Sequence, residues 1–312
     1  MTDNFGRQIT YLRMSVTDKC NLRCRYCMPE EGVAIKSHAD MLTEEEMITA
    51  VEAAAALGIT KVRITGGEPL IKKNILSICR RTAAVEGVEE VCLTTNGVYL
   101  PTFAKPLKDA GVKRINLSLD TLQPDKFAYI TRMGKLEDFF AGLHAALDAG
   151  FEKIKINAVL MGGVNEDEIR PLAALTQQYP VDVRFIELMP MHDSGQTYIS
   201  CAKVLEQLPE AIPVATEGVA KQYCLPDALG KIGLISPVSD HFCGECNRIR
   251  LTADGRVKPC LHSAEEYALK GLDLEGMKAV LKAAIENKPV WHGDLDAMHR
   301  SRAGRNMNQI GG

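Results

Sequence analysis

Three cysteines lie close together near the start of the chain, at a spacing suited to binding a metal centre. Cys20, Cys24 and Cys27 form a Cys-x3-Cys-x2-Cys motif, with Tyr26 directly before the third cysteine. Thiolates are the usual ligands of iron–sulfur clusters. Three thiolates leave one iron of a four-iron cluster without a protein ligand, whereas a structural metal site is closed by four ligands. The motif therefore predicts a cluster whose open iron binds a small molecule, with a zinc knuckle or a chance clustering of cysteines as the alternatives.

A second group of three cysteines lies toward the end of the chain. Cys243, Cys246 and Cys260 form a Cys-x2-Cys-x13-Cys motif. The residues between them read as a small hairpin, 248–252 and 256–259, around an Asp-Gly turn. The hairpin brings the third cysteine back toward the first two, so the sequence predicts a second cluster with one open iron.

The second motif also carries positive charge and has its own alternative interpretation. Arg248 and Arg250 are two residues apart, so on an extended strand both side chains point to one side. Guanidinium groups bind phosphate in a bidentate manner, which suits a substrate that has both a nitrogenous base and phosphates. A zinc site with His241 or His262 as the fourth ligand is equally compatible with the cysteine spacing alone.

The elements that must position these motifs alternate along the chain. The strand-like runs cover residues 11–17, 61–65, 91–95, 114–120, 153–160 and 183–189. The helical patterns cover residues 43–57, 69–84, 102–110, 136–149, 167–179 and 202–208. Such alternation implies parallel strands joined by right-handed crossovers. The prediction is an α/β fold with a partial (βα)6 TIM-like barrel, short of the eight units of a full barrel.

The pattern changes after about residue 209, where proline and glycine break the chain into short pieces. The predicted hairpin follows, and then a helix over residues 274–287. We therefore expect a barrel core over residues 1–225 and a small C-terminal domain over residues 226–312 that carries the second, auxiliary cluster.

The predicted strands have one polar and one apolar face. The polar positions are Arg13, Ser15, Thr17, Arg63, Thr65, Asn116, Ser118, Asp120, Lys155 and Asn157. An ordinary barrel fills its interior with Val, Ile and Leu. Here we expect the apolar face to pack on the outer helices and the polar face to line an interior that holds an anionic ligand, since buried Arg and Lys need partners. An open sheet with one wet face is the alternative, although parallel sheets are usually covered on both faces.

Composition excludes several classes of function. The 312 residues are 46% apolar, and the net charge of -3 does not suggest a general binder of nucleic acids or membrane surfaces. No apolar run approaches the ~18 residues of a membrane span, and the polar N-terminus has no signal-peptide core. Ten cysteines in a reducing compartment favour metal binding or burial over disulfides, so we expect a cytoplasmic protein.

The first cysteine motif and Gly66-Gly67-Glu68-Pro69, at the end of the second strand, together resemble the signatures of the radical S-adenosylmethionine superfamily. The resemblance implies that Cys20, Cys24 and Cys27 hold a 4Fe-4S cluster. Its open iron would chelate the amino and carboxylate groups of S-adenosylmethionine. The reduced cluster would then cleave this cofactor to a 5'-deoxyadenosyl radical.

The stretch Cys-x2-Cys-Asn-Arg-x-Arg-Leu-Thr-x-Asp-Gly and the final Gly-Gly narrow the resemblance to the GTP 3',8-cyclase family, also called molybdenum cofactor biosynthesis protein A. The resemblance covers nearly the whole chain. It implies a second 4Fe-4S cluster on Cys243, Cys246 and Cys260. It also implies cyclisation of GTP to (8S)-3',8-cyclo-7,8-dihydroguanosine 5'-triphosphate, the first step of molybdenum cofactor biosynthesis.

The same resemblance implies roles for individual residues. Contacts to S-adenosylmethionine fall on Tyr26, Gly67, Ser118 and Met189. Contacts to GTP fall on Arg13, Arg63, Thr94, Lys155, Arg248 and Arg250. Catalytic roles fall on Arg248, Arg250, Gly311 and Gly312, with the glycine tail entering a narrow active-site channel. As alternatives, Met189 is plain core, Arg13 and Lys155 form structural ion pairs, and the tail is disordered.

Partners follow from the implied reaction. We expect an electron donor such as flavodoxin or ferredoxin, a downstream cyclic pyranopterin monophosphate synthase, and a monomer or homodimer that binds neither nucleic acid nor membrane. Two competing interpretations remain open at this point: a peptide-modifying radical enzyme with an auxiliary-cluster domain, and a non-catalytic zinc-binding protein.

Overall fold

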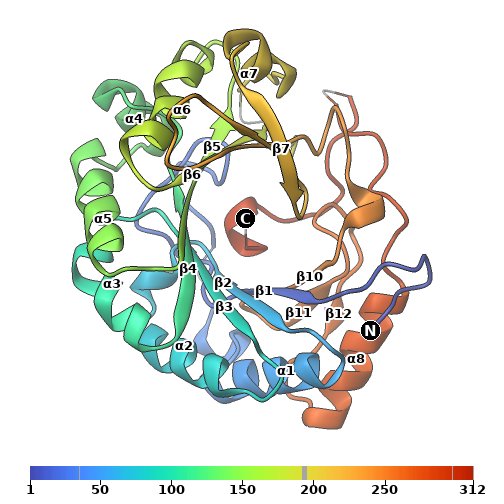
Figure 1. The fold of residues 1–312 in the computed structure, drawn as a ribbon. Helices are drawn as coiled ribbons and strands as arrows, with labels where there is room; N and C mark the ends of the chain where they lie inside the picture. Colours follow the sequence, from blue (N-terminus) through green and yellow to red (C-terminus); the bar gives the residue numbers. More distant parts are fainter. Residues whose placement is uncertain (35, 192–194, 297, 312) are drawn as a thin grey trace.

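A computed structural model describes residues 1–34, 36–191, 195–296 and 298–311 of the chain. Within this part, one twelve-stranded sheet curls around the centre of the molecule, and the helices lie mainly outside it (Figure 1). The consecutive parallel strands are β1 (Tyr11–Ser15), β2 (Lys61–Thr65), β3 (Glu90–Thr95), β4 (Val112–Ser118), β5 (Lys153–Leu160) and β6 (Asp182–Glu187). The predicted partial (βα)6 barrel is confirmed.

The helices between these strands match the predicted alternation, with one addition. They are α1 (Glu44–Ala56), α2 (Ile75–Ala84), α3 (Leu100–Asp109), α4 (Pro124–Thr131), α5 (Leu136–Asp148), α6 (Ile169–Gln178) and α7 (Ala202–Gln207). Short 3-10 helices are η1 (His38–Asp40), η2 (Pro69–Ile71), η3 (Glu166–Glu168), η4 (Cys243–Glu245) and η5 (Met307–Gln309). Helix α4 was not predicted: it is only eight residues long and begins directly at a proline.

Helix α1 begins where its sequence predicts. The Thr43 hydroxyl accepts a hydrogen bond from the Glu46 amide at 3.2 Å, and the Glu46 carboxylate accepts one from the Thr43 amide at 2.8 Å. This capping box satisfies amides that the first helical turn leaves unpaired. Gly58, with φ of +88°, directly follows the C-cap residue Leu57 and turns the chain into β2.

The C-terminal part of the chain extends both edges of the barrel sheet. At one edge, β9 (Ile232–Ile235) pairs parallel with β6, and β8 (Ala220–Cys224) and β7 (Ile212–Glu217) follow antiparallel. At the other edge, β10 (Arg248–Leu251) pairs parallel with β1, followed by β11 (Arg256–Lys258) and β12 (Tyr267–Ala268). The sheet therefore continues through residues on both sides of position 225, and helix α8 (Leu274–Glu286) packs on α1.

No strands were predicted for the proline- and glycine-rich region between residues 209 and 238, although three strands form there. Pro213 is tolerated because β7 is the last strand at its edge of the sheet and needs no donor on its outer side. Gly233 lies inside β9, where a side chain would meet the Arg184 stem at 3.1 Å. The hairpin of β10 and β11 and the last helix were predicted correctly.

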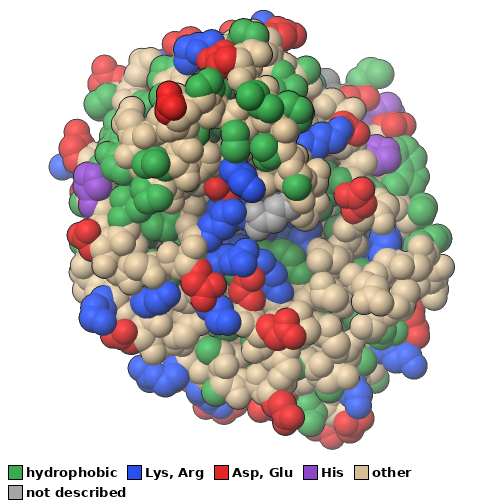
Figure 2. All heavy atoms as spheres, in the orientation of Figure 1, with side chains coloured by type: hydrophobic (Ala, Val, Ile, Leu, Met, Phe, Trp, Pro, Cys, Tyr) green, Lys and Arg blue, Asp and Glu red, His purple; other side chains and the backbone are tan. Residues whose placement is uncertain are grey.

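The two faces of the barrel strands separate as predicted. Leu12, Met14 and Ile64 are fully buried in the main apolar core, between the sheet and the helices. On the other face, strand register places Arg13 between Arg250 on β10 and Arg63 on β2. Figure 2 shows Lys and Arg side chains gathered around a hollow at the centre of the molecule. No helix in the described part of the chain is long and apolar enough to cross a membrane.

Candidate active site

The first cysteine motif forms a tight loop directly after β1. The amides of Cys27 and Met28 donate to the carbonyl of Cys24 at 2.9 and 3.1 Å. The Leu22 amide donates to the Cys20 sulfur at 3.3 Å. Burial raises the pKa of Cys20 to about 11 and that of Cys27 to about 12. These thiols therefore need a bound cation to become thiolates, which is what a metal centre supplies.

Two glycines let the loop after β2 pack against the backbone that leads to Cys20. The Gly67 amide donates to the Thr17 carbonyl at 2.8 Å. A Cβ on Gly67 would lie 2.2 Å from the Lys19 carbonyl oxygen, and one on Gly66 would lie 2.5 Å from the Thr17 oxygen. Such distances leave no room for any side chain. Close packing at Gly67 thus fixes the position of the cysteine loop, independently of the predicted contact of Gly67 with S-adenosylmethionine.

Glu68, to which the sequence analysis assigned no role, connects its own loop, after β2, to the loop after β3. Its side chain is fully buried and accepts from the Thr95 hydroxyl and from the Asn96 amide, both at 2.8 Å. Burial raises the pKa of Glu68 to about 7, although these hydrogen bonds oppose the shift. The carboxyl group therefore holds together the loops that follow β2 and β3.

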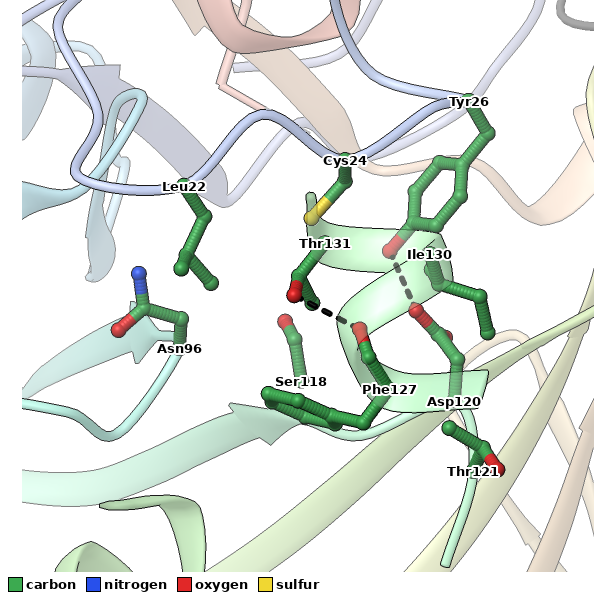
Figure 3. A pocket seen from close by; sticks show the side chains of 10 residues that line it. All are labelled: Leu22, Cys24, Tyr26, Asn96, Ser118, Asp120, Thr121, Phe127, Ile130 and Thr131. Carbon is green, nitrogen blue, oxygen red and sulfur yellow. Dashed lines mark hydrogen bonds between the residues drawn. The ribbon is translucent and has the colours of Figure 1, made fainter. Parts of the chain in front are cut away.

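A pocket opens beside the first cysteine motif (Figure 3). It is lined by Leu22, Cys24, Tyr26, Asn96, Ser118, Asp120, Thr121, Phe127, Ile130 and Thr131. The Tyr26 hydroxyl donates to the Asp120 carboxylate at 2.9 Å, and Asp120 also accepts from the Val159 amide at 2.8 Å. Burial raises the pKa of Asp120 to about 6. The sequence analysis missed the pocket wall supplied by α4, because it did not predict that helix.

The predicted S-adenosylmethionine contacts do not all lie in one place. Tyr26 and Ser118 line this pocket together with Cys24, and Gly67 lies on the loop packed against the cysteine loop. Met189 instead packs in a small apolar cluster with Ile310, next to the C-terminal tail. The structure therefore groups Tyr26 and Ser118 and places Met189 toward the tail.

The second cysteine motif is held by residues far away in the sequence. Cys243 begins η4, Cys246 directly follows it, and Cys260 follows β11. Lys288 is buried, and its ammonium group donates to the carbonyls of Arg248 and Pro259 at 2.9 and 2.7 Å. One lysine thus ties the residue before Cys260 to the strand that follows Cys246. The sequence analysis missed Lys288, because its short Asn-Lys-Pro context is typical of an exposed turn.

The charges around Cys246 favour its thiolate form. Burial raises its pKa, but Arg248 and Lys288 more than offset this and lower it to about 6. The Arg248 guanidinium also lies 5.2 Å from the centre of the Phe242 ring. This cysteine is therefore prepared to act as a metal ligand.

A single zinc ion would need a fourth ligand beside the three cysteines of the second motif. In the described residues, no three His, Cys, Asp or Glu side chains are arranged to hold one metal ion. His262, the predicted zinc alternative, has its Nδ1 at 3.0 Å from the Ser301 hydroxyl, and its ring packs 5.0 Å from that of His292. Zinc needs four donors at about 2.0–2.3 Å from one ion, whereas a four-iron cluster distributes its thiolates over separate irons.

Positive charge is concentrated inside the barrel between the two motifs. Arg63 donates to the Tyr11 hydroxyl, to the Leu93 carbonyl at 3.3 Å and to the Thr94 hydroxyl at 3.4 Å. Burial, together with nearby Arg63 and Arg248, lowers the pKa of Arg13 to about 10, although Tyr11 opposes this. Arg13, Arg63, Thr94 and Arg250 thus share one wall of the interior.

Lys155 lies on the neighbouring wall and has a carboxylate partner. Its ammonium group is 4.0 Å from the Asp182 carboxylate, which also pairs with Lys153 at 2.9 Å. The alternative expectation of an ion pair is therefore met for Lys155. Strand register places Thr94, Asn116 and Lys155 side by side on β3, β4 and β5.

The C-terminal tail runs into the barrel, and its last described residues lie at the centre of the view in Figure 1. The carbonyl of Gly311 accepts from Arg13 at 3.2 Å and also from Arg250, which donates to the Ile310 carbonyl at 3.1 Å. Gly311 has φ of +69°, and a Cβ there would lie 2.3 Å from the Thr65 hydroxyl. Gly312, the other predicted tail residue, lies outside the described residues.

An ion-pair network anchors this tail. Arg305 donates to both oxygens of Glu266 at 2.6 Å and to both oxygens of Asp254 at 3.0 Å. Lys36, on the loop after the first cysteine motif, also pairs with Asp254. The buried Lys258 pairs with Glu266 at 3.1 Å. The network connects the tail, the auxiliary hairpin and the first cysteine loop, and the sequence analysis missed it.

Comparison with known proteins agrees with this geometry. Residues 14–176 match the radical SAM superfamily, and residues 181–293 match Molybdenum Cofactor Synthesis C. Streptococcus suis SuiB bound to S-adenosylmethionine is similar in fold, with a TM-score of 0.64 and 14% identity over 92% of this chain and 65% of that chain. Native anSMEcpe with bound AdoMet has a TM-score of 0.58 and 15% identity over 87% and 81%. Fold and cysteine motif together define a radical SAM enzyme.

Proteins related in sequence identify the family more specifically than the fold does. A protein named GTP 3',8-cyclase from Alkaliphilus oremlandii is 45% identical, and the alignment covers all of both chains. A protein of the same name from Moorella thermoacetica is 44% identical, also over all of both chains. The chain belongs to the GTP 3',8-cyclase family.

Replacing Gly67 with alanine tests the close packing of the first cysteine loop. Because a Cβ there meets the Lys19 carbonyl at 2.2 Å, we expect Gly67→Ala to displace Cys20 and lower the melting temperature. Iron after anaerobic reconstitution should fall from about eight to about four per chain. Glu52→Ala, at an exposed position of α1 outside both cysteine motifs, is the control and should keep full iron content and an unchanged melting temperature. Full iron content and an unchanged melting temperature in Gly67→Ala would contradict the packing argument.

Replacing Arg305 tests the anchoring of the tail. We expect Arg305→Met to speed removal of the C-terminal residues by carboxypeptidase about tenfold or more, because two charge-assisted pairs are lost. Mass spectrometry of the trimmed chain gives the rate. Arg302→Met, an exposed arginine on the same tail, should digest like the wild type. Equal rates for the two variants would show that the ion pairs do not hold the tail.

Proposed function

We propose that this chain converts GTP to (8S)-3',8-cyclo-7,8-dihydroguanosine 5'-triphosphate, the first step of molybdenum cofactor biosynthesis. One observation carries the proposal: Arg250, Arg13 and Arg63 lie side by side on three neighbouring strands inside the barrel. A row of three guanidinium groups, of which Arg63 and Arg250 are buried, attracts anions, and a triphosphate supplies several negative charges. Membership of the GTP 3',8-cyclase family supports GTP as that partner.

Six cysteines would hold the metal centres. Cys20, Cys24 and Cys27 would hold one 4Fe-4S cluster, and Cys243, Cys246 and Cys260 would hold the other. When bound and reduced, the first cluster supplies the electron that cleaves S-adenosylmethionine to the 5'-deoxyadenosyl radical. The proposed contacts of this chain to the cofactor are Tyr26, Gly67, Ser118 and Met189.

The chain's own residues bind and orient the nucleotide. The proposed GTP contacts are Arg13, Arg63, Thr94, Lys155, Arg248 and Arg250. Over the reaction GTP loses a hydrogen atom from C3', forms a C3'–C8 bond and takes up one electron and one proton. These changes need C3' held near the radical carbon and water kept out, and the polar residues inside the barrel are placed to hold the nucleotide in this way.

The tail completes the proposed site. The carbonyl of Gly311 accepts hydrogen bonds from Arg13 and Arg250, so the tail orients two of the proposed GTP contacts. We propose catalytic roles for Arg248, Arg250, Gly311 and Gly312. A bulkier residue in place of Gly311 would collide with Thr65.

Several wider expectations belong to the same proposal. We propose an electron donor such as flavodoxin or ferredoxin, transfer of the product to a cyclic pyranopterin monophosphate synthase, and a monomer or homodimer. Thiolate ligands persist in a reducing compartment, which supports a cytoplasmic location. We also keep the division into a barrel core, 1–225, and an auxiliary-cluster domain, 226–312.

The peptide-modifying alternative has no specific support. SuiB bound to precursor peptide SuiA is similar in fold, with a TM-score of 0.65 at 13% identity. A likeness at this level concerns the fold alone. Membership of the GTP 3',8-cyclase family disfavours the zinc-binding alternative.

Isotope transfer tests the proposed reaction. We expect anaerobic incubation with dithionite, S-adenosylmethionine and GTP deuterated at C3' to move deuterium into 5'-deoxyadenosine and yield a cyclised nucleotide. Arg250→Met should lower kcat/KM at least tenfold with iron content unchanged, because it removes a buried contact to phosphate. Arg256→Met, an exposed arginine on the same hairpin, should match the wild type. Unlabelled 5'-deoxyadenosine from protein with both clusters loaded would contradict the proposal.

A further inference from the structure

Two asparagines on the interior face of the barrel have amide oxygens without partners. Asn116 on β4 is 5% exposed, and Asn157 lies on the neighbouring β5. The Oδ1 atoms of both are buried and have no hydrogen-bond partner in the part of the chain that the structure describes. A buried polar group left unpaired costs stability, and most buried polar groups are paired. These two amides therefore call for a physical explanation.

A third buried asparagine shows how this fold treats an amide that it uses structurally. Asn165 donates to the carbonyls of Asp120 and Val159 at 2.7 and 2.8 Å, and accepts from the Met161 amide at 2.8 Å. All three interactions are with the backbone around the ends of β4 and β5. Among the residues that the structure describes, the Asn116 Oδ1 atom has no such partner, so this oxygen contributes nothing comparable to the fold.

The position of Asn116 places it among the proposed nucleotide contacts. Its chain neighbours Ile115 and Leu117 are fully buried in the apolar core, so the Asn116 side chain faces the interior. In the strand register Asn116 lies between Thr94 and Lys155, both proposed GTP contacts. Asn157 lies beside Ser118, a proposed S-adenosylmethionine contact.

The chemistry of an amide indicates which part of a nucleotide it would contact. The triphosphate is matched by the nearby arginines, because guanidinium groups pair with phosphate oxygens. An amide is uncharged and both donates and accepts, as does a ribose hydroxyl group. A hydroxyl can pair with either end of the amide, so the match does not depend on which way the amide is turned.

We propose that Asn116 binds a ribose hydroxyl group of GTP and thereby orients the C3' carbon for hydrogen removal. This inference rests on the proposed function and adds a positioning residue to it. S-adenosylmethionine also carries a ribose. Asn157 lies opposite Ser118, a proposed S-adenosylmethionine contact, in the register of β4 and β5. The shared chemistry is a ribose hydroxyl group, and the ligands used in the test separate its two sources.

Loss of the Asn116 amide should not destabilise the ligand-free protein. Removing an amide that lacks a partner in the ligand-free protein should leave the melting temperature unchanged or raise it. Removing a fully bonded amide should lower it. Asn165→Ala is therefore the matched control for Asn116→Ala: it makes the same chemical change at another buried asparagine.

The test measures melting temperature and binding by calorimetry, anaerobically and without reductant, on protein with both clusters loaded. The ligands are GTP, 2'-deoxy-GTP, 3'-deoxy-GTP and S-adenosylmethionine. We expect Asn116→Ala to bind GTP about three- to tenfold more weakly, as loss of one hydrogen bond implies. It should bind one of the two deoxy nucleotides as the wild type does, and its affinity for S-adenosylmethionine should be unchanged.

The outcomes are distinguishable. A loss of affinity for S-adenosylmethionine instead of GTP would overturn the assignment of Asn116 to the GTP ribose. Unchanged affinity for every nucleotide, or a fall in melting temperature like that of Asn165→Ala, would overturn the binding role itself. Failure of the wild-type protein to bind GTP would overturn the proposed function, and with it this inference.

Discussion

The crowding of arginine side chains inside the barrel is the constraint on which the rest of the site depends. Neighbouring strands lie about 4.8 Å apart, so Arg250, Arg13 and Arg63 repel one another at close range. Burial and the neighbouring arginines hold the pKa of Arg250 well below its usual range. In this structure the Tyr11 hydroxyl and two tail carbonyls provide the hydrogen bonds that these cations need. A barrel with this interior is suited to hold an anion.

Buried carboxylates at the carboxyl ends of the strands hold the loops around this interior. Four of them are Glu68, Asp120, Glu168 and Glu187. Each accepts a hydrogen bond at 2.7–3.0 Å from a backbone amide of another segment, and the donors are Asn96, Val159, Leu122 and Val238. Loops joined in this way keep their positions, so the first cysteine loop and the pocket beside it share one rigid support. The carboxylates thus perform a structural task in a part of the fold where catalytic residues are also expected.

Sequence was sufficient for features that depend on local pattern. The alternation of Arg13 and Arg63 with buried apolar residues predicted a polar barrel interior, and the cysteine spacing predicted both metal sites. The sequence was not sufficient to predict contacts between residues that lie far apart along the chain. Lys288 supports the second cysteine motif through carbonyls that precede it by 29 and 40 residues. The partners of Arg305 precede it by 39 and 51 residues. No local pattern marks such contacts, and the same holds for α4, whose role as a pocket wall follows only from its packing.

The most direct measurement is an anaerobic crystal structure of the iron-loaded protein with GTP and S-adenosylmethionine. We expect phosphate oxygens within about 3 Å of the guanidinium groups of Arg13, Arg63 and Arg250, with the nucleotide between the two clusters. A triphosphate bound outside the barrel, or a fourth side chain that closes either cysteine trio, would contradict the account.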